Sequence, residues 1–115
     1  MKSANDQLAH HMGSESVTRE PISRCVYTEG VKELIEIGKC YWLVSDILIY
    51  QLEHRFKQEE FQHWRLERKD EVNFMLTCDD GNERIILERE YMSDFPFDEV
   101  DLYYENNVLY LPSER

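Results

Sequence analysis

The sequence has few of the features that mark an exported or membrane-inserted protein. No apolar run approaches the roughly 18 residues that a membrane-spanning helix needs, and the first residues lack the apolar core of a signal peptide. There are three cysteines, Cys25, Cys40 and Cys78, an odd number without a Cys-x-x-Cys pair. These absences predict reduced thiols and a cytoplasmic location.

Positive charge and glycine are also scarce. The 115 residues include 13 lysines and arginines against 24 aspartates and glutamates, which gives a net charge of −11. DNA, RNA and anionic membranes need clustered basic side chains, so none of them is expected as a direct partner, whereas a basic protein is. The four glycines do not cluster, which excludes a phosphate-binding loop.

What is present is the composition of a globular protein. Hydrophobic residues make up 42% of the chain and aromatic residues 12%, which suits one core at this length. We expect a single domain over residues 1–115. It would have a short helix and an irregular segment at 1–21, a helical part at 22–56 and an antiparallel sheet at 61–112.

The first half of the chain shows helical patterns. Ser3 and Thr28 are suitable N-caps, because their hydroxyl groups can accept from the free N–H groups of a first turn. Apolar residues then recur at helical spacing, and glycine follows as a stop signal. The expected helices span 5–12, ending at Gly13, about 29–38, ending at Gly38, and about 40–56, with a short extended segment at 22–27.

The second half alternates between apolar and polar side chains with period 2, as antiparallel strands do when one face lies on a core. Asp79-Asp80-Gly81-Asn82 and Asn106-Asn107 are turn signals, because Gly and Asn tolerate positive φ. The expected fold class is α+β, with two or three N-terminal helices packed on one face of a four- to five-stranded antiparallel meander sheet. The expected strands are near 61–67, 72–78, 85–91, 100–104 and 108–111.

Several short motifs together resemble a known family. They are Tyr27-Thr28-Glu29-Gly30-Val31-Lys32-Glu33-Leu34, Tyr41-Trp42-Leu43, Phe61-Gln62-His63-Trp64, Leu76-Thr77-Cys78-Asp79-Asp80, Asp94-Phe95-Pro96 and Leu111-Pro112-Ser113-Glu114. In this order they are similar to a small family of unknown function from bacteria, their plasmids and their phages. The resemblance spans nearly the whole chain. It implies a mobile-element context and carries over no activity, ligand or catalytic residue.

The acidic, tyrosine-rich stretch near the C-terminus is the main candidate for function. If Val100, Leu102 and Tyr104 face the core, the residues between them face outward together. Tyrosine is favoured at binding interfaces, and carboxylates along a strand could replace the phosphates of a nucleic acid. The predicted protein-binding residues are Asp98, Glu99, Asp101, Tyr103, Glu105 and Tyr110.

The predicted function is therefore a small acidic protein-binding module without catalysis. Its concrete form is an inhibitor of the anti-CRISPR type, encoded on a mobile element, that mimics nucleic-acid charge and occludes a basic nucleic-acid-handling or defence protein. The same stretch is also explained by edge-strand packing, with charges that prevent aggregation.

Two other classes stay open. A small enzyme or ligand-binding domain would have its pocket between the helix at 40–56 and the sheet, because a mid-helix carboxylate among apolar neighbours needs a partner if it is buried. The residues of that pocket would be Trp42, Asp46, Gln51 and Trp64. A homodimeric regulatory or antitoxin-type module is the other class, and it would need an apolar interface.

Residues for catalysis or for a metal do not form a pattern. His10 and His11, adjacent on an expected helix, should point in different directions and be poor co-ligands. A cysteine nucleophile would need a histidine base beside Cys25 or Cys40, and Cys78 shares the register of core positions. No catalytic residue, metal or cofactor is predicted.

Overall fold

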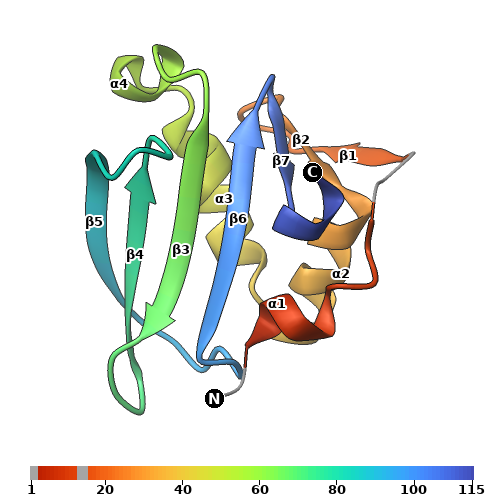
Figure 1. The fold of residues 1–115 in the computed structure, drawn as a ribbon, viewed down its shortest axis with the longest axis vertical. Helices are drawn as coiled ribbons and strands as arrows, with labels where there is room; N and C mark the ends of the chain where they lie inside the picture. The colour runs from red at the N-terminus through yellow and green to blue at the C-terminus, as the bar shows by residue number, and fades with distance from the viewer. Residues whose placement is uncertain (1–2, 13–15) are drawn as a thin grey trace.

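The computed structural model describes residues 3–12 and 16–115 as an α+β fold (Figure 1). Its helices are α1 (Ala4–Gln7), α2 (Glu29–Gly38), α3 (Tyr41–Tyr50), α4 (His54–Lys57) and the 3-10 turn η1 (Pro112–Glu114). Its strands are β1 (Val17–Arg19), β2 (Val26–Thr28), β3 (Gln62–Arg68), β4 (Asn73–Asp79), β5 (Ile85–Met92), β6 (Glu99–Glu105) and β7 (Val108–Tyr110).

The strands of the described residues form one sheet in the order β1-β2-β7-β6-β3-β4-β5. The predicted antiparallel pairs β3–β4, β4–β5 and β6–β7 are confirmed. The predicted sheet of four to five strands was too small, however, and not purely antiparallel. Strand β2 joins as a parallel neighbour of β7, and β1, in a segment expected to be irregular, pairs with β2.

The predicted meander order is wrong at one place, because β6 lies beside β3 and not beside β5, the strand that precedes it. The connection between β5 and β6 crosses the end of the sheet, where Phe95 and Phe97 are buried. Arg68 holds this crossing, since its guanidinium donates to the carbonyl oxygens of Phe95 and Phe97 at 2.7 and 3.2 Å. Alternation along a strand says nothing about which strand lies beside it, so the pattern could not give this order.

Helices α2 and α3 lie behind the sheet in Figure 1, against the face on which Trp64, Leu66 and Leu102 are buried. The prediction that the helices cover one face holds for these two. Helix α1 instead contacts the other side of β6, where the Asn5 side chain donates to Asp101 at 2.8 Å. The sheet is therefore covered on both sides at β6.

Both predicted N-caps are confirmed. The Ser3 hydroxyl accepts from the N–H of Asn5, and that of Thr28 from the N–H of Val31. Helix α1 is shorter than expected, and its expected end at Gly13 lies outside the described residues.

The helix predicted at 40–56 is divided, because α3 ends at Tyr50 and α4 begins at His54. At the division the Gln51 side chain donates to the Ile47 carbonyl, the acceptor that its own backbone N–H would use in a continuing helix. The Gln51 N–H bonds instead to Leu48, three residues back, which tightens the last turn.

None of the helices in the described part of the chain is both long and apolar enough to cross a membrane. The three cysteines are buried and free of disulfide bonds. Burial raises the pKa of Cys40 to about 12 and also raises that of Cys78. The prediction that Cys78 is a core residue is confirmed by its complete burial.

Candidate functional site

Three of the predicted binding residues, Asp98, Glu99 and Asp101, are paired with cations from strand β3. Arg68 donates to Asp98 at 3.0 Å, and Arg65 donates to Asp101 at 2.8 Å. Arg65 also contacts Glu99. We call these three carboxylates the β6 ladder. It forms because Arg65 lies directly opposite Asp101 in the register between the two strands.

Asp101 has the most partners of the ladder. The ring nitrogens of His63 lie 2.7 Å from Asp101 and 3.0 Å from Asp79, so the imidazole bridges two carboxylates. Burial by itself raises the pKa of Asp101, but hydrogen bonds from His63, Arg65 and Asn5 bring it below its usual value. The hydrogen bond to Asp101 raises the pKa of His63, against the lowering effect of burial. The ladder is electrostatically satisfied within the chain.

The predicted tyrosines are packed against other rings. The ring centroid of Tyr103 lies 5.0 Å from that of Phe61 and 5.9 Å from that of Tyr110, and the Arg115 guanidinium lies 5.4 Å from it. The Tyr110 hydroxyl donates to Glu105 at 2.5 Å. Burial, and to a smaller extent this hydrogen bond, raises the pKa of Tyr110. All six residues predicted for protein binding are thus partly or fully buried by their own chain.

The residues of the second predicted site fall into two groups, one beside Tyr91 and one beside Gln62. Asp46 accepts a hydrogen bond from the Tyr91 hydroxyl at 3.0 Å, and the Trp42 ring lies 5.1 Å from the Tyr91 ring. Trp64 is fully buried in the core. Of this set, Gln51 alone lines the cleft described next.

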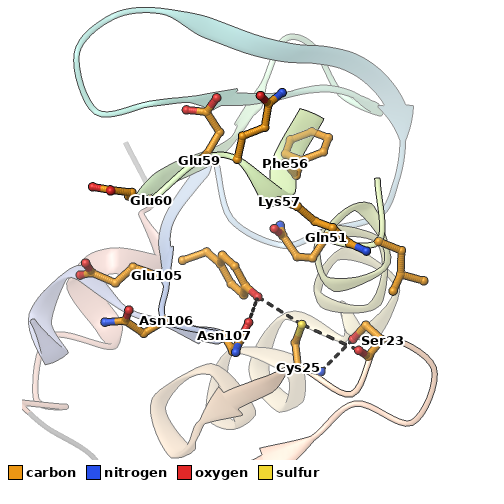
Figure 2. Close-up of a pocket in the computed structure, with 13 residues that line it drawn as sticks. Ser23, Cys25, Gln51, Phe56, Lys57, Glu59, Glu60, Glu105, Asn106 and Asn107 are labelled. Carbon is orange, nitrogen blue, oxygen red and sulfur yellow. Dashed lines mark hydrogen bonds between the residues drawn. The ribbon is translucent and has the colours of Figure 1, made fainter. Parts of the chain in front are cut away.

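A cleft of about 710 Å³ opens beside the division between α3 and α4 (Figure 2). Its walls come from the segment before β2, the end of α3, the connection from α4 to β3, and the turn from β6 to β7. It brings together Gln51 and Glu105, one residue from each predicted site. The lining residues are Ser23, Cys25, Gln51, Leu52, Phe56, Lys57, Gln58, Glu59, Glu60, Tyr104, Glu105, Asn106 and Asn107.

The inner part of the cleft is a small polar cluster around the Tyr104 hydroxyl. This oxygen lies 3.1 Å from the Cys25 sulfur and donates to the Asn107 side chain at 3.4 Å, as Figure 2 shows. Burial and then the contact with Cys25 raise the pKa of Tyr104. No histidine is among the described residues that line the cleft, so Cys25 has no imidazole base there.

Behind the cleft, two buried glutamines hold α3 and β3 together. The Gln51 and Gln62 side-chain amides exchange hydrogen bonds of 2.7 and 2.8 Å. Gln62 also accepts from the Trp64 indole N–H at 2.9 Å and donates to the Phe56 carbonyl at 3.2 Å. Gln62 is not among the site residues predicted from the sequence. The sequence feature that could have identified Gln62 is its position, because it lies on the same inward face of β3 as Trp64 and Leu66. A buried amide there needs hydrogen-bond partners, and such partners make its surroundings rigid.

The outer part of the cleft is acidic. Three carboxylates, Glu59, Glu60 and Glu105, stand there against Lys57 among the lining residues, which leaves a net charge of −2, although Glu59 is also paired with Arg84, outside the lining. Glu60 is exposed and has neither an ion pair nor a hydrogen bond to any residue that the structure describes. In Figure 2 the carboxylates of Glu60 and Glu105 project to the same side. We call Glu59, Glu60 and Glu105 the cleft rim.

The two N-terminal histidines lie close together, which corrects the prediction that they point apart. Helix α1 ends at Gln7, so His10 and His11 do not have helical spacing. Their ring centroids are 4.3 Å apart, and the Nε2 atom of each lies 3.4 Å from the same carboxylate oxygen of Glu33.

The chain matches the model of a family of unknown function, DUF6876, over residues 2–115. It belongs to this family. The resemblance inferred from the motifs is therefore confirmed for the family itself. Neither the comparison with curated proteins nor the comparison with solved structures gave a match. The family supplies no activity, so a function can be argued only from the geometry of the cleft and of the surfaces around it.

Proposed function

We propose that this member of DUF6876 is a protein-binding module without catalysis, whose cleft accepts a basic segment of a partner protein. The observation that supports this is the acidic rim at the mouth of a 710 Å³ cleft with an amide-rich lining. A Lys or Arg side chain that enters would meet the carboxylates of Glu60 and Glu105 first. Among the other lining residues, the exposed side chains of Asn106 and Asn107 offer amide oxygens that can accept from its N–H groups.

The cleft is a better candidate than the outward face of β6. Each carboxylate of the β6 ladder already has an Arg or His partner, so a basic partner protein would compete with cations of the same chain. At the rim, Glu60 has no such competitor among the described residues, and Glu105 bonds only to a neutral hydroxyl group there. Carboxylates without an internal cation attract a basic partner more strongly.

The absence of catalysis is part of the proposal, and it rests on the composition of the cleft. The thiol of Cys25 contacts Tyr104 and the Ser23 carbonyl, and no described residue of the lining is an imidazole that would take its proton. With a mobile-element context as the resemblance implies, the partner would be a nucleic-acid-handling or defence protein. Occluding its basic groove is the anti-CRISPR form of the proposal.

The test is affinity capture from a nuclease-treated lysate of the native host, read by mass spectrometry at low and high salt. Three baits are compared: wild type, the rim variant E60Q/E105Q, and the control variant E88Q/E90Q. The control likewise removes two carboxylates, in this case both exposed and on edge strand β5. The amide that replaces the Glu105 carboxylate keeps an acceptor oxygen for the Tyr110 hydroxyl, so the rim variant should retain the fold.

We expect wild type and the control variant to capture a basic protein at low salt and to release it at high salt. The rim variant should not capture this protein. With the purified partner, the rim variant should weaken Kd at least tenfold. Equal capture by the rim and control variants, or capture of no basic protein, would contradict the proposal. Self-association of all three baits would point to the homodimeric class.

The inner polar cluster favours a second candidate, a small-ligand site. The Tyr104 hydroxyl, the Cys25 thiol and the Asn107 amide converge at the bottom of the cleft, and a few convergent polar groups are usual in ligand sites. Ligand screening distinguishes the two candidates. A small molecule that binds wild type but not Y104F, with equal binding to E60Q/E105Q, would support the ligand site over the peptide site.

A further inference from the structure

His10, His11 and Glu33 form a cluster that shares no residue with the lining of the cleft. The histidines follow α1, and Glu33 is on α2, which lies beside this segment in Figure 1. One ligand atom from each residue can be chosen so that all three lie within 4.8 Å of one another. Both Nε2 atoms are 3.4 Å from the same Glu33 oxygen.

The two separations between a histidine nitrogen and the Glu33 oxygen fit a tetrahedral metal site. Zn²⁺ binds imidazole nitrogen and carboxylate oxygen at about 2.0–2.1 Å, so two ligands at the tetrahedral angle lie about 3.3–3.4 Å apart. Both N···O separations, at 3.4 Å, have this value. A direct hydrogen bond between a neutral imidazole and a carboxylate would be shorter, about 2.7–3.2 Å.

The orientation of the rings also suits ligation. The Nδ1 atom of His10 lies 3.1 Å from the Gln7 carbonyl, so it carries the hydrogen of that bond and leaves the Nε2 lone pair available. The Nε2 atom of His11 is buried and makes no hydrogen bond to a described residue. A buried ring nitrogen that makes no hydrogen bond costs free energy that a bound cation would recover.

We propose that His10, His11 and Glu33 bind one Zn²⁺ ion, with a fourth position left for water or another ligand. Two imidazoles favour a borderline-soft cation of the first transition row over Mg²⁺ and Ca²⁺, which take oxygen ligands. His11 and Glu33 are separated by more than twenty residues along the chain, so the bound ion would link the segment after α1 to helix α2. This site is independent of the proposed protein-binding cleft.

The test is titration of the full chain with ZnCl₂ in competition with a chromogenic chelator. H10A, H11A and E33Q each remove one ligand, and H54A and E36Q are matched controls. His54 is an exposed histidine outside the cluster, and Glu36 is an exposed glutamate on the same helix as Glu33. We expect one Zn²⁺ per chain in wild type and in both controls, at least tenfold weaker binding in each ligand variant, and no binding of Mg²⁺ or Ca²⁺.

X-ray absorption spectroscopy of the zinc-loaded protein gives a second, independent measurement. Two imidazoles with oxygen in the remaining positions support the site, whereas a sulfur ligand would assign the metal to a cysteine and overturn it. Because the His10 side chain is 61% exposed, H10A should keep the fold even if H11A does not. Zinc affinity of folded H10A equal to that of wild type would contradict the proposal.

Discussion

The β6 ladder and the cleft rim contain the same chemical groups, but all three ladder carboxylates have a cationic partner, whereas at the rim only Glu59 does, with Arg84. In the ladder, Asp101 and Glu99 have side chains that are 16% exposed, and both share Arg65. At the rim, Glu60 is exposed and has no cationic partner in the described part of the chain. Both groups contribute equally to the net charge of −11.

The difference shows that an acidic sequence does not by itself make an acidic binding surface. A carboxylate in register with a guanidinium on the next strand is used to hold the sheet together, and its charge is largely cancelled. At the rim, Glu59 is paired with Arg84, but Glu60, on the loop before β3, has no cationic partner among the described residues, so its charge remains available to a partner. We accordingly propose that the ladder contributes to stability, and that Glu60 and Glu105 of the rim contribute to recognition.

The largest expected effect is from R65M, which removes the cation that Glu99 and Asp101 share. Two enclosed carboxylates would then lose their shared donor, so the free energy of unfolding should fall by about 2–3 kcal/mol. Urea denaturation followed by circular dichroism measures this change.

R84M is the matched control, because the Arg84 side chain is 59% exposed and pairs with Glu59 of the rim. It should cost no more than about 0.5–1 kcal/mol, as exposed pairs do. Equal losses for R65M and R84M would remove the distinction between ladder and rim.

A smaller effect on the free energy of unfolding is expected from the titration of His63, which bridges Asp101 and Asp79. Because the pKa of His63 is raised in the folded state, its contribution to stability is complete below the unfolded value of about 6.5. The contribution is lost as the pH rises through the folded pKa. The free energy of unfolding of wild type should therefore decrease as the pH rises above about 6.5, and that of H63Q should decrease less.

Urea denaturation of both proteins at a series of pH values checks this prediction. The difference between them isolates His63 from the other histidines. A difference that stays constant with pH would mean that His63 carries no extra proton in the folded protein.

The smallest effect on the free energy of unfolding is expected from removing one carboxylate charge from the cleft rim or from the β6 ladder. E60Q should change the free energy of unfolding by less than about 0.5 kcal/mol, because the exposed carboxylate has no described partner. E99Q makes the same chemical change beside Arg65 and should cost about 1 kcal/mol. Thermal and urea unfolding of the two variants compare them, and a larger loss for E60Q would reverse the assignment of the two groups.

Local features of the fold could be predicted from the sequence because they depend on neighbours along the chain. The caps at Ser3 and Thr28 need only a hydroxyl group within three residues of free N–H groups. The alternation through Trp64 and Leu66 gives the inward face of β3 for the same reason. The turn at Asn106 and Asn107 is confirmed by positive φ at both residues.

Features that depend on contacts between distant segments could not be predicted. The end of α3 is set by Gln51, whose side chain bonds across to Gln62 on β3. Tyr103 is only partly exposed because Phe61 and Arg115 pack against its ring. No period in the sequence encodes which of these residues meet. For this reason neither predicted set of site residues identified the cleft, although each set contributes one residue to its lining, Gln51 or Glu105.

The sequence by itself determined the family, the α+β class, the ends of α2, the hairpins and the excess of negative charge, because composition, caps and periodicity are local properties. The tertiary structure decided the strand order, the parallel pairing of β2 with β7, and which carboxylates are neutralised within the chain. It also placed His10 and His11 beside Glu33. These outcomes depend on which distant residues come into register, and register is set by packing of the whole core.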